Sequence, residues 1–379
     1  MKLSCTKDNL YRVLSITSHL TNKNVNLPVL QNVLIKTSGG NIKLTTTNLE
    51  IAINCAVRGK VDEEGETTIP SKLFFDFVSL LPNENVVMET QGDNLNIVCG
   101  NHKTKINGLA ASEFPLVPSV QGSWSCRVPS EALRNALGRV LFSVATNESR
   151  PELTGVCTQF SSSEKGTVLT LAATDSYRLA EAKILLDQEP QGESKDLIIP
   201  ARTLSEVNRI LSVFKDDVDA PAEIVLQVSE NQVVFSFGTV EIISRTIEGT
   251  YPDYKQIIPK EFQTKAILDK EDFVKSVKAA SLFSKSGLFD VSLNFNAQGN
   301  NLSVKALDTV RGENTAVCSA DTTGLDNSVT VNYRYLLDGL GSIEGDQVMF
   351  QMIDASNPCM LTSKDETKGY LYIIMPIKQ

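Results

Sequence analysis

An internal repeat of about 125 residues occurs three times along the 379 residues of this chain and limits the folds open to it. The sequence Ile-Pro-Ser-Lys-Leu starts at Ile69, and Ile-Pro-Ala-Arg-Thr-Leu starts at Ile199, about 130 residues later. A third copy starts at Val331, with Asn332 in place of proline. Proline is tolerated in the first turn of a helix, so each segment predicts a helix start. A repeat of this length predicts three tandem domains of like fold.

Each repeat contains two predicted helices with strand-like runs between and after them. Apolar residues at helical spacing predict helices over 8–20, 69–81, 130–145, 199–214, 269–283 and 331–343. The intervening runs alternate with period two and are separated by Gly, Asn or Ser, which is typical of β-hairpins. We therefore expect an α+β fold in which two helices pack on β-sheets in each domain. The expected domain limits are 1–122, 123–253 and 254–379.

Composition favours a reduced, non-membrane protein. Hydrophobic residues make up 41% of the chain and charged residues 21%, as in globular proteins. Residues 1–20 lack the continuous apolar core of a secretory signal, and no stretch has the length of a membrane helix. Seven cysteines lie at irregular spacing without a C-x-x-C pair, which fits reduced thiols and no zinc site. We expect a cytoplasmic protein without metal or cofactor.

No catalytic motif stands out. His19 and His102 are the only histidines, and neither a P-loop nor a G-x-G-x-x-G pattern is present. Asp175, Asp308 and Asp354 each follow a predicted strand, and paired acids could bind metals for phosphoryl transfer. A metal-dependent nuclease or phosphotransferase is therefore one alternative. An aspartate that caps a turn explains each of them better, so a non-enzymatic role is preferred.

The basic residues of the predicted helices lie opposite the apolar stripes. The net charge of −9 argues against a surface that binds nucleic acid everywhere, but it allows a local basic stripe. A solvated polar face explains any single helix. If the repeat placed all six outer faces on one surface, their cations would contact duplex phosphates without reading sequence. A β-rich protein-binding scaffold with no nucleic-acid role is the second alternative.

Four motifs in order resemble the bacterial β sliding clamp, the processivity subunit of the replicative DNA polymerase. They are Leu27 to Leu30, Ala173 to Leu179, Gly249 to Tyr254, and Met375 to Lys378, and the resemblance runs over the whole chain. It implies three like domains and two chains closed head-to-tail into a ring, with helices lining a hole for duplex DNA. It also implies tethering of the replicative polymerase, the clamp loader, repair polymerases and mismatch-repair proteins.

The resemblance further implies one hydrophobic peptide-binding pocket per chain, between the second and third domains. Thr174 and Arg178 would supply polar groups to orient the peptide, and apolar residues would form an adaptable cleft. The residues implied are Leu153, Thr174, Tyr177, Arg178, Leu179, Pro252, Ile257, Tyr335, Pro358, Met375, Pro376 and Ile377.

The chain departs from the family at two places. Ser176 and Tyr177 stand where the family often has Gly-His, which predicts a different polar edge for the pocket. Asn24 stands where a basic residue is frequent, which makes Lys23 the candidate DNA contact there. The full set expected to face DNA is Lys23, Arg12, Arg150, Arg202, Arg209, Lys275, Lys278 and Arg334.

Overall fold

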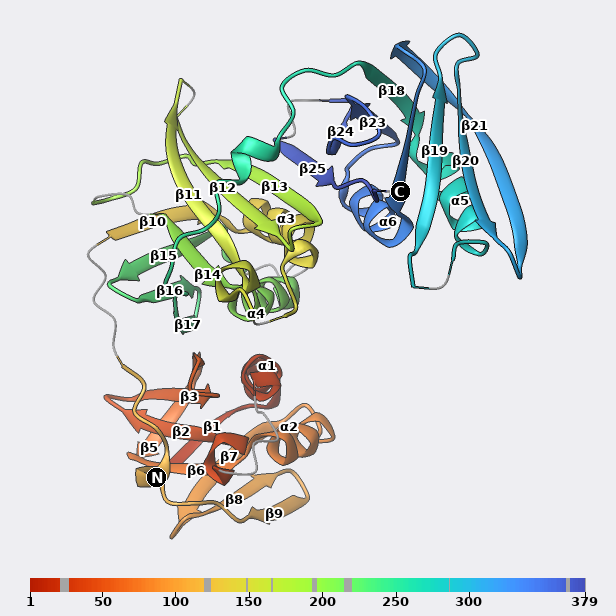
Figure 1. The fold of residues 1–379 in the computed structure, drawn as a ribbon. Helices are drawn as coiled ribbons and strands as arrows, with labels where there is room; N and C mark the ends of the chain where they lie inside the picture. Colours follow the sequence, from red (N-terminus) through yellow and green to blue (C-terminus); the bar gives the residue numbers. More distant parts are fainter. Residues whose placement is uncertain are drawn as a thin grey trace. The chain divides into compact units, whose positions relative to one another are not determined.

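The computed structural model describes residues 1–20, 27–118, 124–147, 149–164, 166–192, 196–214, 220–285, 287–365 and 369–378. The chain forms two compact units, each held together by its own sheets (Figure 1). Unit 1 consists of Met1–Glu131, Asp187–Ser194 and Glu206–Thr246. Unit 2 consists of Ala132–Leu186, Lys195–Ser205 and Ile247–Gln379.

Unit 1 has two sheets, and every strand pair in them is antiparallel. The five-stranded sheet has the order β5-β1-β7-β8-β9, with β1 (Lys2–Thr6), β5 (Gly59–Glu63), β7 (Asn85–Gln91), β8 (Asn94–Cys99) and β9 (His102–Ile106). The eight-stranded sheet has the order β10-β15-β16-β17-β4-β3-β2-β6, with β2 (Asn32–Ser38), β3 (Asn41–Thr47), β4 (Ile51–Val57), β6 (Gly65–Pro70), β10 (Trp124–Pro129), β15 (Glu223–Ser229), β16 (Gln232–Phe237) and β17 (Val240–Arg245).

Unit 2 is built on a single antiparallel sheet of twelve strands, in the order β14-β11-β12-β13-β25-β24-β23-β18-β21-β20-β19-β22. The strands are β11 (Gly155–Ser163), β12 (Gly166–Thr174), β13 (Arg178–Leu185), β14 (Leu197–Pro200), β18 (Thr264–Asp269), β19 (Asp290–Asn296), β20 (Asn301–Asp308), β21 (Gly312–Gly324), β22 (Asn327–Asn332), β23 (Gln347–Met352), β24 (Cys359–Ser363) and β25 (Tyr370–Ile374).

Among the described residues, two α-helices occur in each repeat, as the apolar periodicity predicts. They are α1 (Lys7–Thr17), α2 (Ser71–Ser79), α3 (Ser130–Val140), α4 (Ala201–Val213), α5 (Lys270–Ser281) and α6 (Tyr333–Ser342). Short 3₁₀ turns lie at η1 (Ser18–Leu20), η2 (Pro28–Gln31), η3 (Ala111–Glu113), η4 (Leu141–Ser143), η5 (Pro151–Thr154) and η6 (Tyr254–Ile257).

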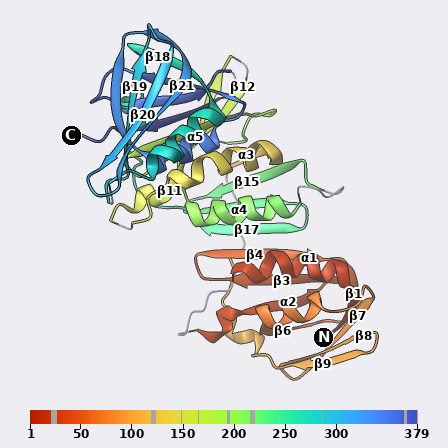
Figure 2. The same ribbon diagram turned by 90° about the vertical axis from the view of Figure 1, so that its right-hand side faces the viewer.

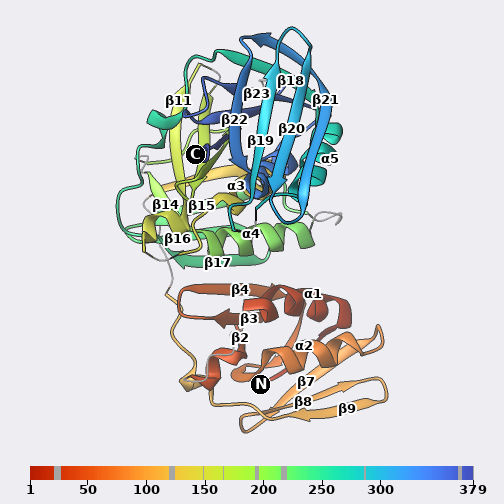
Figure 3. The same ribbon diagram turned by 45° about the vertical axis from the view of Figure 1, so that its right-hand side comes forward.

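The predicted apolar stripes are the buried faces of these helices. On α5, Phe273, Val277 and Ala280 are fully buried, and the helix lies across β20 and β21 (Figure 3). The helices α1 and α2 pack side by side (Figure 2). None of the described helices is both long and apolar enough to cross a membrane.

Two features differ from the sequence-based expectation. Pro70 and Pro200 are the last residues of strands β6 and β14, paired with Asn32 and Gly155, so they precede the helices instead of lying in the first turn. The backbone of Pro70 (φ −55°, ψ 113°) is extended, which the proline ring permits at a strand end. The strands β1, β10 and β18, which lead into the first helix of each repeat, were not predicted.

Consecutive repeats are joined by the same strand pairing at two places. We call the pairing of β4 with β17 the first joint and the pairing of β13 with β25 the second joint. In both, the third strand after a repeat's first helix pairs with the last strand of the following repeat. The first joint lies within unit 1 and the second within unit 2.

Candidate functional site

A tight turn from Thr174 to Arg178 leads into strand β13 at the second joint. The Asp175 carboxylate oxygen Oδ1 accepts hydrogen bonds from the backbone N–H groups of Tyr177 (2.9 Å) and Arg178 (3.0 Å). The Thr174 hydroxyl donates to the Arg178 carbonyl (2.6 Å) and accepts from the Ser176 N–H (3.1 Å). Ser176 adopts the left-handed conformation, with φ 77°. Side-chain to backbone hydrogen bonds of this kind stabilise a sharp turn of the chain. The turn leaves the Tyr177 side chain 63% exposed.

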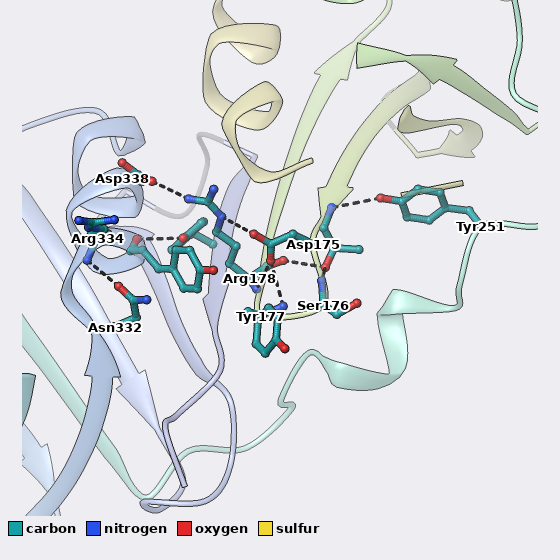
Figure 4. A network of polar contacts seen from close by, with 11 residues as sticks. Asp175, Ser176, Tyr177, Arg178, Tyr251, Asn332, Arg334 and Asp338 are labelled. Atoms are coloured by element: carbon teal, nitrogen blue, oxygen red, sulfur yellow. Dashed lines mark hydrogen bonds and ion pairs between the residues drawn. The ribbon is translucent and has the colours of Figure 1, made fainter. Parts of the chain in front are cut away.

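Two carboxylates and two aromatic rings hold the Arg178 guanidinium. Its Nε donates to Asp175 (2.9 Å), and Nη1 pairs with Asp338 on α6 (Figure 4). The guanidinium lies 4.6 Å from the ring centre of Tyr335 and 5.4 Å from that of Phe142. The side chain is only 12% exposed. Arg178 therefore ties the turn to α6 by ion pairs and cation–π contacts, which use its Nε and Nη1 donors within the protein.

The C-terminal segment closes over this turn. Arg178 pairs with Ile374 in the β13–β25 ladder, and the Met375 N–H donates to the Tyr177 carbonyl (2.9 Å). The Ile377 N–H donates to the Thr330 carbonyl (2.8 Å). Cys359 is the partner of Ile374 in β24, which brings the preceding Pro358 alongside Met375. The main chain thus places the C-terminal residues of the predicted pocket beside its turn.

An apolar cluster lies beneath the joint. Leu179 is buried together with Cys157, Ala172, Tyr254 and Ile373, and Ile257 packs against this cluster. The Tyr254 hydroxyl donates to the buried Glu181 carboxylate (2.7 Å).

The linker to the third repeat also closes on the turn. The Thr174 N–H donates to the Tyr251 hydroxyl oxygen (3.1 Å; Figure 4), and burial raises the pKa of that phenol. The Pro252 carbonyl accepts from the Tyr254 N–H.

The twelve predicted pocket residues divide into a support and a surface. Leu153, Thr174 and Leu179 are buried at 2%, 6% and 0% exposure, so their side chains offer almost no surface to a peptide. The others are at least partly exposed: Tyr177, Arg178, Pro252, Ile257, Tyr335, Pro358, Met375, Pro376 and Ile377. Sequence reasoning missed Asp338 and Phe142, which hold Arg178; a single aspartate on the polar face of a helix carries no signal of such a role.

The aspartates considered for metal chemistry are turn residues. Asp308 accepts from the N–H groups of Val310 and Arg311 (both 2.8 Å), and Asp354 does the same for Ser356 and Asn357. These backbone hydrogen bonds hold the pKa of Asp308 and Asp354 below the usual value. Over the described parts of the chain, no three His, Cys, Asp or Glu side chains are grouped to hold a metal. The turn interpretation is confirmed for all three aspartates, Asp175 included.

The predicted DNA-facing residues lie in different surroundings. Arg202, Lys278 and Arg334 are exposed on their helices; Lys275 is exposed beside Glu271 (2.7 Å), and Arg150 pairs with Glu152 (2.9 Å). Arg12 is half-buried, with its guanidinium 4.5 Å from the centre of the Phe214 ring. Lys23, like Asn24, lies outside the described residues.

Arg209 does not project into solvent as the helical projection predicts. Its guanidinium pairs with Glu206 (2.8 Å) and donates to the carbonyls of Ser15 (3.2 Å) and Ile16 (2.8 Å) near the end of α1. Carbonyls at a helix C-terminus lack helical partners, which makes them good acceptors for an arginine. The helical projection failed because it took no account of the neighbouring helix.

Comparison with known proteins gives the family. Three models match in order: the N-terminal domain of the DNA polymerase III beta subunit over residues 1–118, the central domain over 127–253 and the C-terminal domain over 255–378. The Beta sliding clamp of Staphylococcus epidermidis is 29% identical over 392 residues, covering 100% of this chain and 99% of that protein.

Solved structures agree. The sliding clamp of Bacillus subtilis is 26% identical with a TM-score of 0.90, covering 100% of this chain and 99% of the other. A sliding clamp from Bartonella birtlesii bound to griselimycin is 25% identical with a TM-score of 0.91, and the match covers 100% of both chains.

The three tandem domains and the joint therefore define a sliding clamp, a class of non-catalytic replication protein. The chain belongs to the DNA polymerase III beta subunit family.

Proposed function

We propose that two copies of this chain close head-to-tail into a ring around duplex DNA. The observation that carries this proposal is a pair of unmatched strand edges. Strand β9 pairs with β8, and the first part of β21 pairs with β20; among the described residues neither has a second strand partner there. These are the two positions that correspond to the paired strands of the joints. A β9–β21 pairing between chains repeats the joint and removes both edges.

The joints also give the register of this pairing. Ile53 lies opposite Ile242 at the first joint, and the corresponding residues at the edges are Asn314 and Thr104. The Asn314 carbonyl oxygen Oδ1 is covered and has no hydrogen-bond partner among the described residues. At this register the Thr104 hydroxyl of the second chain faces Asn314, and rotation of the Asn314 side chain toward the interface would give its unpaired oxygen that hydroxyl as a donor.

Contact with DNA is electrostatic in this proposal. Arg202, Lys275, Lys278 and Arg334 are exposed cations on helices of a chain with net charge −9. Such cations contact phosphates without reading bases, so a closed ring stays on DNA and still slides. We propose the same contact with DNA phosphates for Arg12, Arg150 and Lys23. We expect Arg209 to contribute little to DNA binding, because its guanidinium donates to backbone carbonyls of α1.

The second joint is the proposed peptide-binding site for partner proteins. Tyr177, Met375, Pro376 and Ile377 form a half-exposed apolar surface fixed from below by the buried cluster. The partners proposed are the replicative polymerase catalytic subunit, the clamp loader, repair polymerases and mismatch-repair proteins, in the cytoplasm. Because the Bartonella birtlesii relative was solved with griselimycin, that compound is a suitable probe, and we expect it to bind this joint. We keep the domain limits 1–122, 123–253 and 254–379.

Site-directed cross-linking tests ring closure. Thr104→Cys and Asn314→Cys in one chain give a covalent dimer with a short bismaleimide, and the uncross-linked protein sediments at about twice 41.4 kDa. The native thiols do not interfere, since all seven are buried. Burial raises the pKa of Cys126 and Cys157 to about 12. Each single variant is the matched control. Cross-linking by the single variants, or a monomeric mass, contradicts the proposed interface.

A further inference from the structure

The first joint has the same turn as the second. The Asn48 side-chain oxygen accepts from the N–H groups of Glu50 (3.0 Å) and Ile51 (2.8 Å), as Asp175 does at the second joint. The Thr47 hydroxyl donates to the Ile51 carbonyl (2.9 Å) and accepts from the Leu49 N–H (3.0 Å). Leu49 has φ 76°, and Ser176 has φ 77°. The two turns are therefore equivalent residue by residue.

The apolar cluster is also repeated. At the first joint Ala52, Val234 and Ile243 are buried together, with Val117 packed against them. Their equivalents by strand pairing are Leu179, Met360 and Ile373, which belong to the cluster of the second joint. Val117 and Tyr254 each lie two residues beyond a linker proline, Pro115 and Pro252 respectively.

A cavity of about 250 Å³ opens at the first joint. It lies within unit 1 and is lined by the turn, the linker and the end of β17: Thr47, Leu49, Glu50, Ile51, Ala52, Pro115, Leu116, Val117, Pro118, Gln232, Ile243, Ser244 and Arg245. Seven of these are equivalent to residues of the proposed peptide site, with Glu50 in place of Tyr177 and Arg245 in place of Met375. Its volume suits one or two side chains, since pockets for drug-sized ligands are larger.

Two exposed leucines flank this cavity. Leu116 is 99% exposed and stands between Pro115 and Pro118, which restrict the linker backbone. Leu49 is 54% exposed and is held in the left-handed conformation, which leucine rarely adopts. An outlier of this kind beside a cavity is a reasonable sign of function. Large apolar residues at both lips predict an apolar anchor in the occupant.

We propose that this cavity is a second peptide-binding site, for a linear segment of a partner protein that carries an aliphatic residue next to a carboxylate. The aliphatic side chain enters the cavity between Val117 and Ile243. The rim carries two exposed charges, Arg245 and Glu50. The carboxylate pairs with Arg245 and lies on that side of the rim, because Glu50 would repel it. The charged rim distinguishes this site from the second joint, so the two sites select different peptides. The argument by analogy with the second joint rests on the proposed function of that joint. The cavity and the charges that line it are features of the first joint and do not depend on that proposal.

Photo-cross-linking with matched peptides tests the proposal. The probes are three fluorescein-labelled peptides, Gly-Ser-Leu-X-Ser-Gly with X as Asp, Asn or Lys, in which the leucine is photo-reactive. The Asp peptide binds at least fivefold more tightly than the Asn peptide and cross-links to the segment 115–118 or to β17. Arg245→Glu reverses the preference in favour of the Lys peptide. Because Arg245 is exposed, we expect that variant to keep the wild-type melting temperature.

Three results would overturn the inference: no saturable binding of the Asp peptide, unchanged affinity in Arg245→Glu, or cross-links confined to Tyr177 and Met375. Griselimycin is titrated into the same preparations. Loss of griselimycin binding on removal of Met375–Gln379, with Asp-peptide binding retained, keeps both sites. If the wild-type protein fails to bind griselimycin but still binds the Asp peptide, the result contradicts the proposed peptide site at the second joint and leaves the proposed site at the first joint unaffected.

Discussion

The two joints of this chain share one backbone design and differ in side-chain chemistry. Both have a turn with the same four side-chain to backbone hydrogen bonds, followed by an antiparallel strand pair over an apolar cluster. At the first joint the turn ends in Ile51, which is buried; at the second it ends in Arg178, which is held by two carboxylates. The repeat therefore determines the backbone structure of both joints, and single residue differences give each joint its own binding surface.

The largest difference between the joints is expected from Arg178→Ile, which makes the second turn like the first. The change leaves Asp175 and Asp338 facing each other without the cation and removes two cation–π contacts. We expect the local free energy of opening to fall by about 3 kcal/mol, chiefly from the buried pair with Asp175, because Asp338 is 48% exposed and can be solvated. Hydrogen exchange of the β13 and β25 amides measures it. Ile51→Val at the first joint is the control and should cost about 1 kcal/mol. Equal exchange in Arg178→Ile and the wild type would show that the network adds no stability.

Removal of Met375–Gln379 should abolish peptide binding at the second joint and leave the first joint intact. The Met375 N–H bond to the Tyr177 carbonyl is lost together with the apolar end of the proposed site. A labelled peptide from the replicative polymerase of the same organism should bind at least a hundredfold more weakly, or about 2.7 kcal/mol. Fluorescence polarisation measures this, with Arg245→Glu as a control of unchanged affinity. If the truncated protein keeps its affinity, these residues do not belong to the site.

Tyr254→Phe tests a bond that the first joint lacks, since Val117 occupies that place. The phenol donates to the Glu181 carboxylate, which is 3% exposed, and its loss should cost about 1.5 to 2 kcal/mol. Burial, followed by the Glu181 charge, raises the pKa of Tyr254 above its usual value of 10. Its contribution is therefore complete below pH 10 and is lost as the pH rises above it. Urea unfolding at pH 8 and pH 11 should show less alkaline loss in the variant; identical loss would exclude Tyr254 as the cause.

Asp175→Asn and Asn48→Asp exchange the turn residues of the two joints. Both variants keep an oxygen that accepts the two backbone N–H groups. In Asp175→Asn the amide nitrogen replaces Oδ2 and faces the Arg178 Nε–H donor, so the ion pair and its hydrogen bond are both lost, for about 1.5 kcal/mol. Asn48→Asp should change stability by less than about 0.5 kcal/mol. Thermal unfolding followed by circular dichroism compares them. A larger loss in Asn48→Asp would contradict the assignment of charge dependence to the second joint.

Leu49→Gly should have the smallest effect on stability of these variants, and it should stabilise the protein where the others destabilise it. It relieves the left-handed conformation and should stabilise unit 1 by about 0.5 to 1 kcal/mol, while Ser176→Gly should gain less. Calorimetry can resolve the two. A destabilised Leu49→Gly variant would mean that the exposed leucine contributes packing.

Sequence periodicity predicts the elements of this fold well and their ends less well. The stripe Leu204, Val207, Leu211 is buried as expected, because helix amphipathicity depends only on local spacing. Pro70 and Pro200 end strands instead because their strand partners, Asn32 and Gly155, are distant in sequence. Local patterns do not record such pairings.

The proposed peptide-binding site could be predicted from the sequence only where its residues belong to recognisable motifs. The turn from Thr174 and the Met-Pro ending are recognisable in the sequence, but the hold of Asp338 on Arg178 depends on a contact 160 residues away. The cavity of the first joint draws on four separate segments, none of which has a motif. Arg209 shows the same limit, since its acceptors belong to another helix.

We propose that the chain acts as a closed ring on DNA. The most direct measurement loads the labelled protein onto nicked circular DNA with the clamp loader and compares retention before and after linearisation by a restriction enzyme. Retention for many minutes on the circle, with rapid loss from the linear form and recovery of retention when the ends are blocked by bound protein, is the predicted result. Equal loss from circular and linear DNA would contradict topological binding.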